Sequence, residues 1–128
     1  MKIKLLLPAL LLLVASFSGV SAQRIQLNSP EVKEVLKKNK SIVILDVRTA
    51  EEFAAGHLKG AQNMDIYQSD AYSKLDKLNP KTPYLVYCRT NHRSGMAVEY
   101  MMHKGFKTVY QMMDGFPGWV ANNFAYEK

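Results

Sequence analysis

Two short, continuously apolar runs constrain the fold of this chain most strongly. Residues 42–45 and 83–87 contain no charged side chain, and each run is too short for a helix of ordinary length. Such runs are typical of parallel strands that are buried on both faces, because a strand with one solvent face alternates polar and apolar side chains. Helical patterns alternate with these runs, so the sequence predicts an α/β domain with a mostly parallel sheet and helices on both faces.

The other elements follow from capping residues and periodicity. Strands are also predicted at residues 25–27, 61–66 and 106–110. Helices are predicted to begin at residues that can act as N-caps, and the Thr49–Glu52 pair matches a capping box. The expected helix starts are Ser29, Thr49, Ser69 and Ser94, with Gly105 ending the last of these and a short helix following the turn at residues 115–119.

The first 22 residues resemble a secretory signal. Lys2 and Lys4 precede an apolar block at residues 5–17, and small residues then lead to Ala22. This layout predicts cleavage between Ala22 and Gln23, and it leaves residues 23–128 as one domain. An uncleaved anchor is the alternative, but the block is shorter than the roughly 20 residues that a span needs. We therefore expect an exported protein without a membrane span, periplasmic in the first place and secreted as the alternative.

The charge and the cysteine count narrow the function classes. The chain has a formal net charge of +6, but its basic residues are scattered except for the lysines at 33, 37, 38 and 40. Because those lysines fall late in a predicted helix, they favour a solvated helix end over a nucleic-acid site. Cys88 is the single cysteine. It is therefore inert and buried, paired to another chain, or a reactive thiol.

The surroundings of Cys88 favour the reactive thiol. Cys88 follows the apolar run at residues 83–87 and precedes a helix, so it occupies the carboxyl end of a central strand, where α/β proteins place their sites. The short loop can turn backbone N–H groups toward the sulfur, and the helix adds its positive end. Arg89 and Arg93 add fixed positive charge. These features favour the thiolate and would hold an anionic substrate beside it.

Several motifs of the chain, taken in order, resemble those of the single-domain rhodaneses, a family of thiosulfate sulfurtransferases with small exported members. Each is weak alone, and their order and spacing carry the resemblance. They are Asp46-Val47-Arg48, Glu52-Phe53, the run from Gly56 to Ala61, Asn63, the loop Cys88-Arg89 to Arg93-Ser94, and Gly115-Phe116 with Trp119. The resemblance implies a rhodanese-like three-layer domain with a mostly parallel five-stranded sheet.

The length of the loop separates two chemistries within this architecture. Related dual-specificity phosphatases and arsenate reductases have five residues between the cysteine and the arginine, which makes room for a tetrahedral oxyanion. Here four residues separate Cys88 from Arg93. By resemblance, this shorter loop suits a single sulfur atom, and phosphatase activity is disfavoured.

The resemblance also implies a ping-pong sulfur transfer through a Cys88 persulfide. Thiosulfate or a similar small anion would donate the sulfur, and cyanide or a thiol would accept it, with no metal or organic cofactor. Protein partners are not indicated. The residues that we expect to bind the substrate are Arg89, Thr90, Asn91, His92, Arg93 and Ser94.

Three details complete the expected site. Asn91 stands where many members have glycine, and we expect it to adopt the left-handed backbone that asparagine tolerates. Asp46 and Arg48 are expected to be structural, with an Arg48–Glu52 pair across the helix start. His57 is expected to be a hydrogen-bonded structural residue. No metal site is predicted, because the histidines at 57, 92 and 103 are dispersed along the chain.

Two alternatives to catalysis remain at this point. The domain could bind an anion or a partner without turnover, although inactive rhodanese-like domains typically lack the cysteine. Cys88 could instead form a mixed disulfide with another protein. The chain has no second cysteine to resolve such a bond, so this function would need an external thiol.

Overall fold

The computed structural model describes residues 2–4 and 21–128, and it contains a five-stranded parallel sheet. Every strand pair in this sheet is parallel, as expected for strands joined by crossover helices. In spatial order the strands are β1 (Gln23–Leu27), β6 (Thr108–Met112), β5 (Tyr84–Tyr87), β2 (Val43–Asp46) and β4 (Gln62–Asn63).

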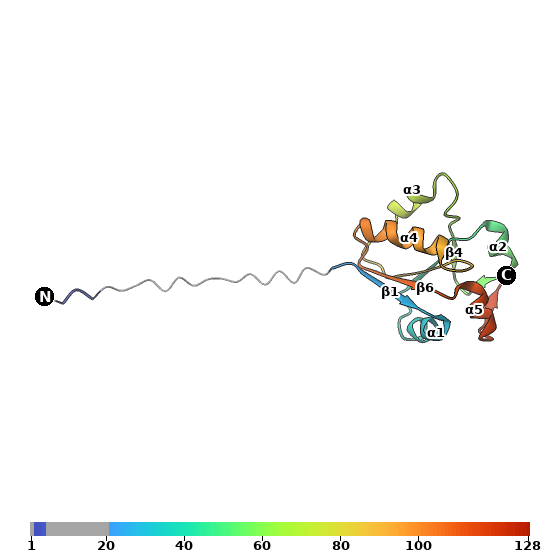
Figure 1. Ribbon diagram of the computed structural model, residues 1–128, viewed down its shortest axis with the longest axis horizontal. Coiled ribbons are helices and arrows are strands. Elements are labelled where there is room, and N and C mark those ends of the chain that lie inside the picture. The colour runs from blue at the N-terminus through green and yellow to red at the C-terminus, as the bar shows by residue number, and fades with distance from the viewer. Residues whose placement is uncertain (1, 5–20) are drawn as a thin grey trace.

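Helices cover both faces of the sheet, which confirms the predicted three-layer α/β architecture (Figure 1). One face carries α1 (Ser29–Lys38) and α5 (Gly115–Ala121), and the other carries α3 (Ala71–Asp76) and α4 (His92–His103). The remaining elements, near one end of the sheet, are α2 (Ala50–Ala55) and a two-stranded antiparallel ribbon of β3 (His57–Leu58) and β7 (Tyr126–Glu127).

Strand β5 shows how the sequence builds two cores. Its side chains are all buried and alternate between the faces, as the twofold period of a strand requires. Tyr84 and Val86 enter the core under α3 and α4, while Leu85 and Tyr87 enter the core under α1 and α5. Cys88 continues the first series and packs in the same core as Val86. The thiol therefore lies on the α4 side of the sheet.

The helix starts differ from the expectations in three places. Only the Thr49 capping box is confirmed, with Glu52 N–H donating to Thr49 Oγ1 over 3.2 Å. Asn28 caps α1 in place of Ser29, and Asp70 caps α3 in place of Ser69. Helix α4 begins at His92 and not at Ser94. Several polar residues that can act as N-caps lie next to one another at these helix starts, so composition alone could not identify which one caps the helix.

Three strands differ from their predicted ranges by two residues or more, and β1 begins at Gln23, two residues earlier than expected. The last parallel strand begins two residues later than expected, because Phe106 belongs to the turn that closes α4. Its N–H bonds to the carbonyl of Met101, and its ring is buried. The predicted strand at residues 61–66 is reduced to β4. The chain beyond β4 remains beside β2, where Met64 and Ile66 donate to the carbonyls of Asp46 and Val47.

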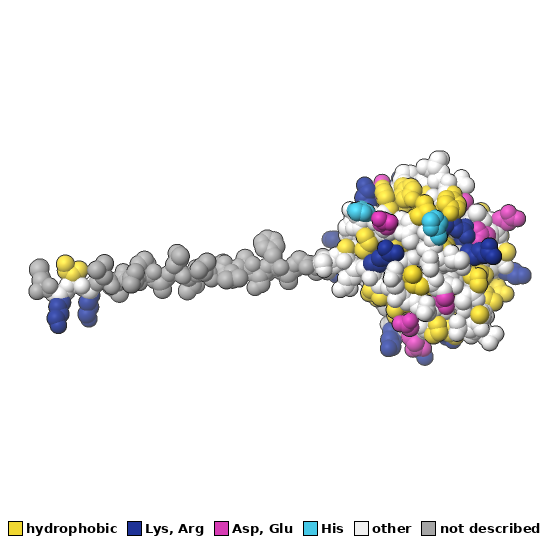
Figure 2. All heavy atoms as spheres, in the orientation of Figure 1, with side chains coloured by type: hydrophobic (Ala, Val, Ile, Leu, Met, Phe, Trp, Pro, Cys, Tyr) yellow, Lys and Arg dark blue, Asp and Glu magenta, His cyan; other side chains and the backbone are white. Residues whose placement is uncertain are grey.

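The expected signal at residues 1–22 lies largely outside the described residues, so it remains a prediction, as does the domain boundary at Gln23. Within the described part of the chain, no helix has both the length and the apolar character needed to cross a membrane. Basic and acidic side chains are interspersed over the face of the domain that Figure 2 shows.

Candidate active site

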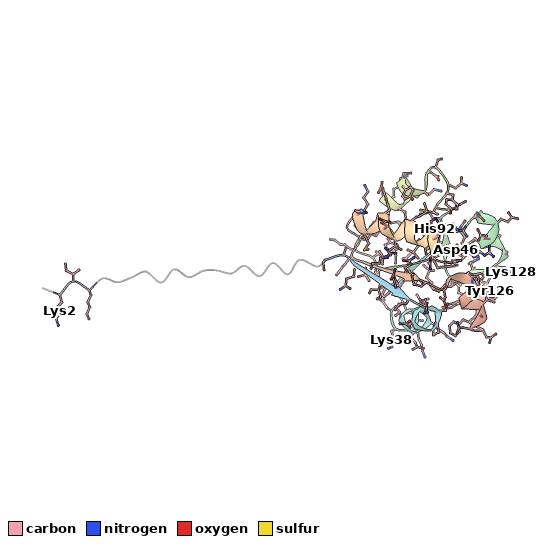
Figure 3. All side chains as sticks on the ribbon, in the orientation of Figure 1. Lys2, Lys38, Asp46, His92, Tyr126 and Lys128 are labelled. Atoms are coloured by element: carbon pink, nitrogen blue, oxygen red, sulfur yellow. The ribbon has the colours of Figure 1, made fainter. Side chains whose placement is uncertain are left out.

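Cys88 lies at the carboxyl end of the central strand β5, beside the end of β2. Asp46, the last residue of β2, is in register with Tyr87, which directly precedes Cys88. Figure 3 labels Asp46 and also His92, the residue at which the loop after β5 leads into α4. Only 1% of the Cys88 surface is exposed.

The loop after Cys88 divides into an exposed rim and a buried base. The expected substrate-binding residues at positions 89–92 are exposed, Arg93 is half-buried, and Ser94 is fully buried. The structure therefore brings all seven predicted site residues into one continuous loop. Only Ser94 and Cys88 lie at its base, where they contact each other.

The Cys88 sulfur accepts a hydrogen bond from the start of α4. The Ser94 N–H lies 3.3 Å from Sγ, and the Ser94 hydroxyl lies 3.5 Å from it. Ser94 is the third residue of α4, and the first N–H groups of a helix have no partner within the helix. The sulfur supplies that partner, and the helix dipole at this end favours negative charge on it.

Two expectations about the loop backbone are wrong. Several successive N–H groups of the loop were expected to turn toward the sulfur, but within the described residues the one backbone N–H bonded to Sγ is that of Ser94. The reason is that α4 begins two residues early, which places Ser94 in its first turn over the sulfur. Asn91 is not left-handed: it is the N-cap of α4, with a φ of −143° and a ψ of 0°.

Arg93 is held in a bidentate ion pair with Glu52 of α2. Its Nη1 lies 2.6 Å from Glu52 Oε1, and its Nη2 lies 3.0 Å from Oε2. These hydrogen bonds lower the pKa of Glu52 from 4.5 to about 2. The expected partner of Glu52 was Arg48, and that prediction is wrong, because Arg48 is occupied elsewhere. The pair joins the loop to α2, 41 residues away in sequence.

Gly115 and Phe116 contact the backbone of Cys88 and Arg89 at the start of the loop. The Phe116 N–H donates to the carbonyl of Cys88 over 2.9 Å. Gly115 has a φ of +63°, and a Cβ at this position would collide with the carbonyl of Arg89. Only glycine combines this backbone conformation with such a close approach of two chain segments. The sequence motif containing Gly115 therefore shapes the site although it lies 27 positions from Cys88.

Gln111 is the residue at the site that sequence reasoning missed. Its side chain is 1% exposed, on β6, beside the base of the loop. Its Nε2 donates to the carbonyl of Asn91 over 3.1 Å and to the Ser94 hydroxyl over 3.0 Å. A glutamine inside the apolar strand segment Val109–Met112 was the available signal, because a buried amide needs partners.

Comparison with known proteins assigns the fold and the loop to one family. The Rhodanese-like domain family matches residues 29–122, which span every site residue described above. The chain belongs to the rhodanese-like family. This confirms the resemblance drawn from the motifs.

Characterised relatives cover most of this rhodanese-like domain. The thiosulfate sulfurtransferase GlpE of Pseudomonas putida is 35% identical over 92 residues, which are 72% of this chain and 82% of that protein. The protein of the same name from Coxiella burnetii is 32% identical over 98 residues, covering 77% of this chain and 89% of its own length.

Solved structures agree with the fold. A rhodanese-related protein from Thermoplasma volcanium superposes with a TM-score of 0.71 at 24% identity, covering 80% of this chain and 97% of its own. The polysulfide-sulfur transferase homodimer of Wolinella succinogenes superposes with a TM-score of 0.68 at 27% identity, covering 81% and 78% of the two chains.

The other expected polar residues of the rhodanese-like domain are structural. Arg48 donates to both carboxylate oxygens of Asp46 and, over 2.6 Å, to the carbonyl of Gly56, where α2 ends. Burial lowers the pKa of Arg48, but the bonds to Asp46 outweigh it and the pKa is raised overall. His57 Nδ1 lies 2.8 Å from the carbonyl of Phe53, and the two rings stack at 3.6 Å.

The described residues contain no group of three histidine, cysteine or carboxylate side chains that could hold a metal ion. The chemistry that the site offers is that of a buried cysteine at a helix N-terminus. One backbone N–H and one hydroxyl contact the sulfur, and the exposed Arg89 stands at the rim.

Proposed function

We propose that this rhodanese-like domain transfers the sulfane sulfur of thiosulfate, or of a similar donor, through a persulfide on Cys88. The observation that carries the proposal is the position of the sulfur at the N-terminus of α4, 3.3 Å from the Ser94 N–H. A helix N-terminus stabilises negative charge on a sulfur, so it favours both the attacking thiolate and the persulfide anion. The names of the Pseudomonas and Coxiella relatives support thiosulfate as the donor.

The reaction balances without an external oxidant or reductant. The Cys88 thiolate attacks the outer sulfur of thiosulfate, a new S–S bond forms, and the old S–S bond breaks with its electron pair leaving on sulfite. The negative charge then resides on the terminal sulfur of the persulfide. Cyanide or a thiolate attacks that terminal sulfur, the persulfide bond breaks, and its electron pair returns to Cys88 as thiolate.

The rim of the site favours a small anionic donor. Cys88 is almost fully buried, so a donor with a small terminal sulfur suits the site better than a bulky one. Arg89 is exposed and the described residues give its side chain no hydrogen-bond partner, which leaves its guanidinium available to a sulfonate-like group. The charge of Arg93 is already balanced by Glu52. Polysulfide is a second donor of the same class, supported by the name of the Wolinella protein.

A mass measurement tests the proposal. Purified protein is incubated with thiosulfate, and the intact mass is compared before and after addition of cyanide. We expect a gain of one sulfur atom that cyanide removes as thiocyanate, and no gain in Cys88→Ser. Wild-type protein that gained no sulfur from thiosulfate or polysulfide would refute the proposal and favour the binding alternative. A disulfide-linked partner on a non-reducing gel would favour the mixed-disulfide alternative.

We also propose that the protein works outside the cytoplasm, in the periplasm if its host has two membranes. The support is the layout of residues 1–22, with two lysines, an apolar block and small residues before Gln23. Sequencing the N-terminus of the protein from a periplasmic fraction tests this, and we expect it to begin at Gln23. An intact N-terminus at Met1 in the cytoplasmic fraction would contradict export.

A further inference from the structure

The amide of Gln111 connects the sheet to the base of the Cys88 loop. We propose that Gln111 is a positioning residue that frees the Ser94 hydroxyl to donate to the Cys88 sulfur whenever that sulfur is anionic. The inference rests on the proposed function in one respect only, since it assumes that Cys88 works as a thiolate and a persulfide. Three observations carry it: the orientation of the amide, the hydrogen-bond count at Asn91, and the geometry around Ser94.

Arg24 fixes the orientation of the amide. Its Nη2 lies 2.6 Å from Gln111 Oε1. A guanidinium can only donate, so the oxygen of the amide must face Arg24 and the NH2 group must face the loop. The Gln111 side chain therefore presents two donors to the loop and no acceptor. This assignment also explains why both loop partners of Gln111 are oxygen atoms.

The carbonyl of Asn91 is fully occupied without Ser94. It accepts the first helical bond of α4 from the Gly95 N–H over 2.9 Å and a second bond from Gln111 Nε2 over 3.1 Å. A carbonyl oxygen has two lone pairs, and these two bonds use both. The Ser94 hydroxyl also lies 3.2 Å from this carbonyl. Its bond there can break without leaving the carbonyl short of a donor, because the bonds from Gly95 and Gln111 remain.

The hydroxyl of Ser94 can therefore serve two states of the sulfur. Beside a neutral thiol, the Cys88 S–H points at Ser94 Oγ and the hydroxyl proton points at Asn91. Beside a thiolate or persulfide the S–H is gone, and the hydroxyl proton turns to the sulfur. Gln111 donates to Ser94 Oγ over 3.0 Å in both states, so it holds the oxygen in place while the proton changes direction.

Replacing Gln111 does not change the charges around the Cys88 loop. The charged and titratable groups around the loop come from the loop and the start of α4, from α2, from the end of β2, from β1 and from the segment between β4 and α3. They are Arg89, His92, Arg93, Glu52, Asp46, Arg48, Arg24 and Tyr67. Gln111 is uncharged, so replacing it with methionine leaves every one of these charges in place. A change in the behaviour of Cys88 would then come from hydrogen bonding.

The test is the rate of Cys88 alkylation by iodoacetamide over a series of pH values. In Gln111→Met we expect the pH of half-maximal alkylation to rise by about half a unit or more, because the Ser94 hydroxyl then stays bonded to the Asn91 carbonyl and no longer turns to the thiolate. A merely structural role would loosen the loop around the buried thiol and raise the maximal rate without moving the half-point. Gln26→Met, at an exposed glutamine on β1, is the matched control and should change neither quantity.

Two further variants decide the route of the effect. In a Ser94→Ala background, Gln111→Met should produce no additional shift, because the hydroxyl through which it acts is absent. Arg24→Met replaces an exposed side chain, so it should fold even if Gln111→Met proves unstable. We expect it to raise the pH of half-maximal alkylation by less than Gln111→Met does. An unchanged half-point in both Gln111→Met and Arg24→Met, or a full shift in the Ser94→Ala background, overturns the inference.

The outcome is separable from that of the proposed function. Alkylation needs no sulfur donor, so a shifted half-point in a protein that forms no persulfide would uphold the role of Gln111 and refute sulfur transfer. A normal persulfide yield in wild-type protein, together with an unchanged pH of half-maximal alkylation in the variants, would uphold sulfur transfer and refute the role of Gln111. If both hold, Gln111→Met should lower the rate of persulfide formation by roughly threefold to tenfold, the range expected for one hydrogen bond.

Discussion

Arg93 and Glu52 form a two-pronged ion pair between the Cys88 loop and α2, with N–O distances of 2.6 and 3.0 Å. The stability that this ion pair contributes to the domain depends on pH. The pKa of Glu52 is lowered to about 2, so its stabilising contribution is complete above 4.5 and is lost as the pH falls from 4.5 toward 2.

Glu52→Gln should therefore destabilise the domain at neutral pH and make little difference at the acid end of this range. Because Glu52 is about one-third exposed, we expect a loss of roughly 1 kcal/mol, measured by urea unfolding at a series of pH values. Glu51→Gln removes an exposed carboxylate one position earlier in α2 and is the control. Equal pH dependence in the two variants would contradict the assignment.

Gly115→Ala should damage both stability and sulfur transfer. The new Cβ would collide with the carbonyl of Arg89, and the backbone would be held at a φ of +63°. Gly105→Ala is the matched control, since Gly105 has a φ of +77° but open space around its Cβ position. We expect the control to lose about 1 kcal/mol for its left-handed backbone and to keep its persulfide yield. Gly115→Ala should lose more stability than the control, measured by urea unfolding, and should also lose persulfide yield, measured by intact mass.

Arg48→Met should be among the most destabilising single changes in the domain. It would leave the Asp46 carboxylate, which is fully buried, without its cation, and α2 without its anchor at Gly56. Breaking a buried pair in this way costs about 3 kcal/mol or more. Lys74→Met breaks the exposed pair with Asp70 and should cost less than about 0.5 kcal/mol in the same unfolding assay. Similar losses in the two variants would show that burial is not the cause.

The two arginines of the loop should differ in their effect on substrate. Arg89→Met removes an exposed guanidinium and should raise the KM for thiosulfate with a smaller effect on kcat, most strongly at low ionic strength. Arg93→Met removes a paired guanidinium and should mainly reduce stability, because Glu52 loses its partner. Steady-state kinetics at two salt concentrations separate these outcomes. A larger KM effect at Arg93 would show that the pair opens to bind substrate.

The sequence predicted the parts of this molecule that depend on local pattern. The apolar runs located β2 and β5, and the Thr49 capping box located α2. The predicted site residues lie together because they are consecutive, from Cys88 to Ser94. The position of a loop between a central strand and a helix is enough to predict a site.

The parts that could not be predicted depend on partners far apart in the chain. Glu52 could pair with Arg48 or Arg93 on charge alone, and the choice follows from Asp46 being buried beside Arg48. The position of Gln111 against the loop depends on the pairing of β5 with β6. The start of α4 at His92 was missed because Asn91 and Ser94 are both acceptable caps, and only the tertiary contact of Ser94 with the sulfur distinguishes them.

The pairing of β1 with β6 has a consequence for how the domain is made. Gln23 lies in register with Thr108, and β1 has no other neighbour in the sheet. Strand β1 must therefore wait for its partner until synthesis has reached Met112. A sheet with such a distant closing contact forms late and slowly. Its edge, and with it the support of Arg24 for the thiol loop, is completed only after β6 has been delivered.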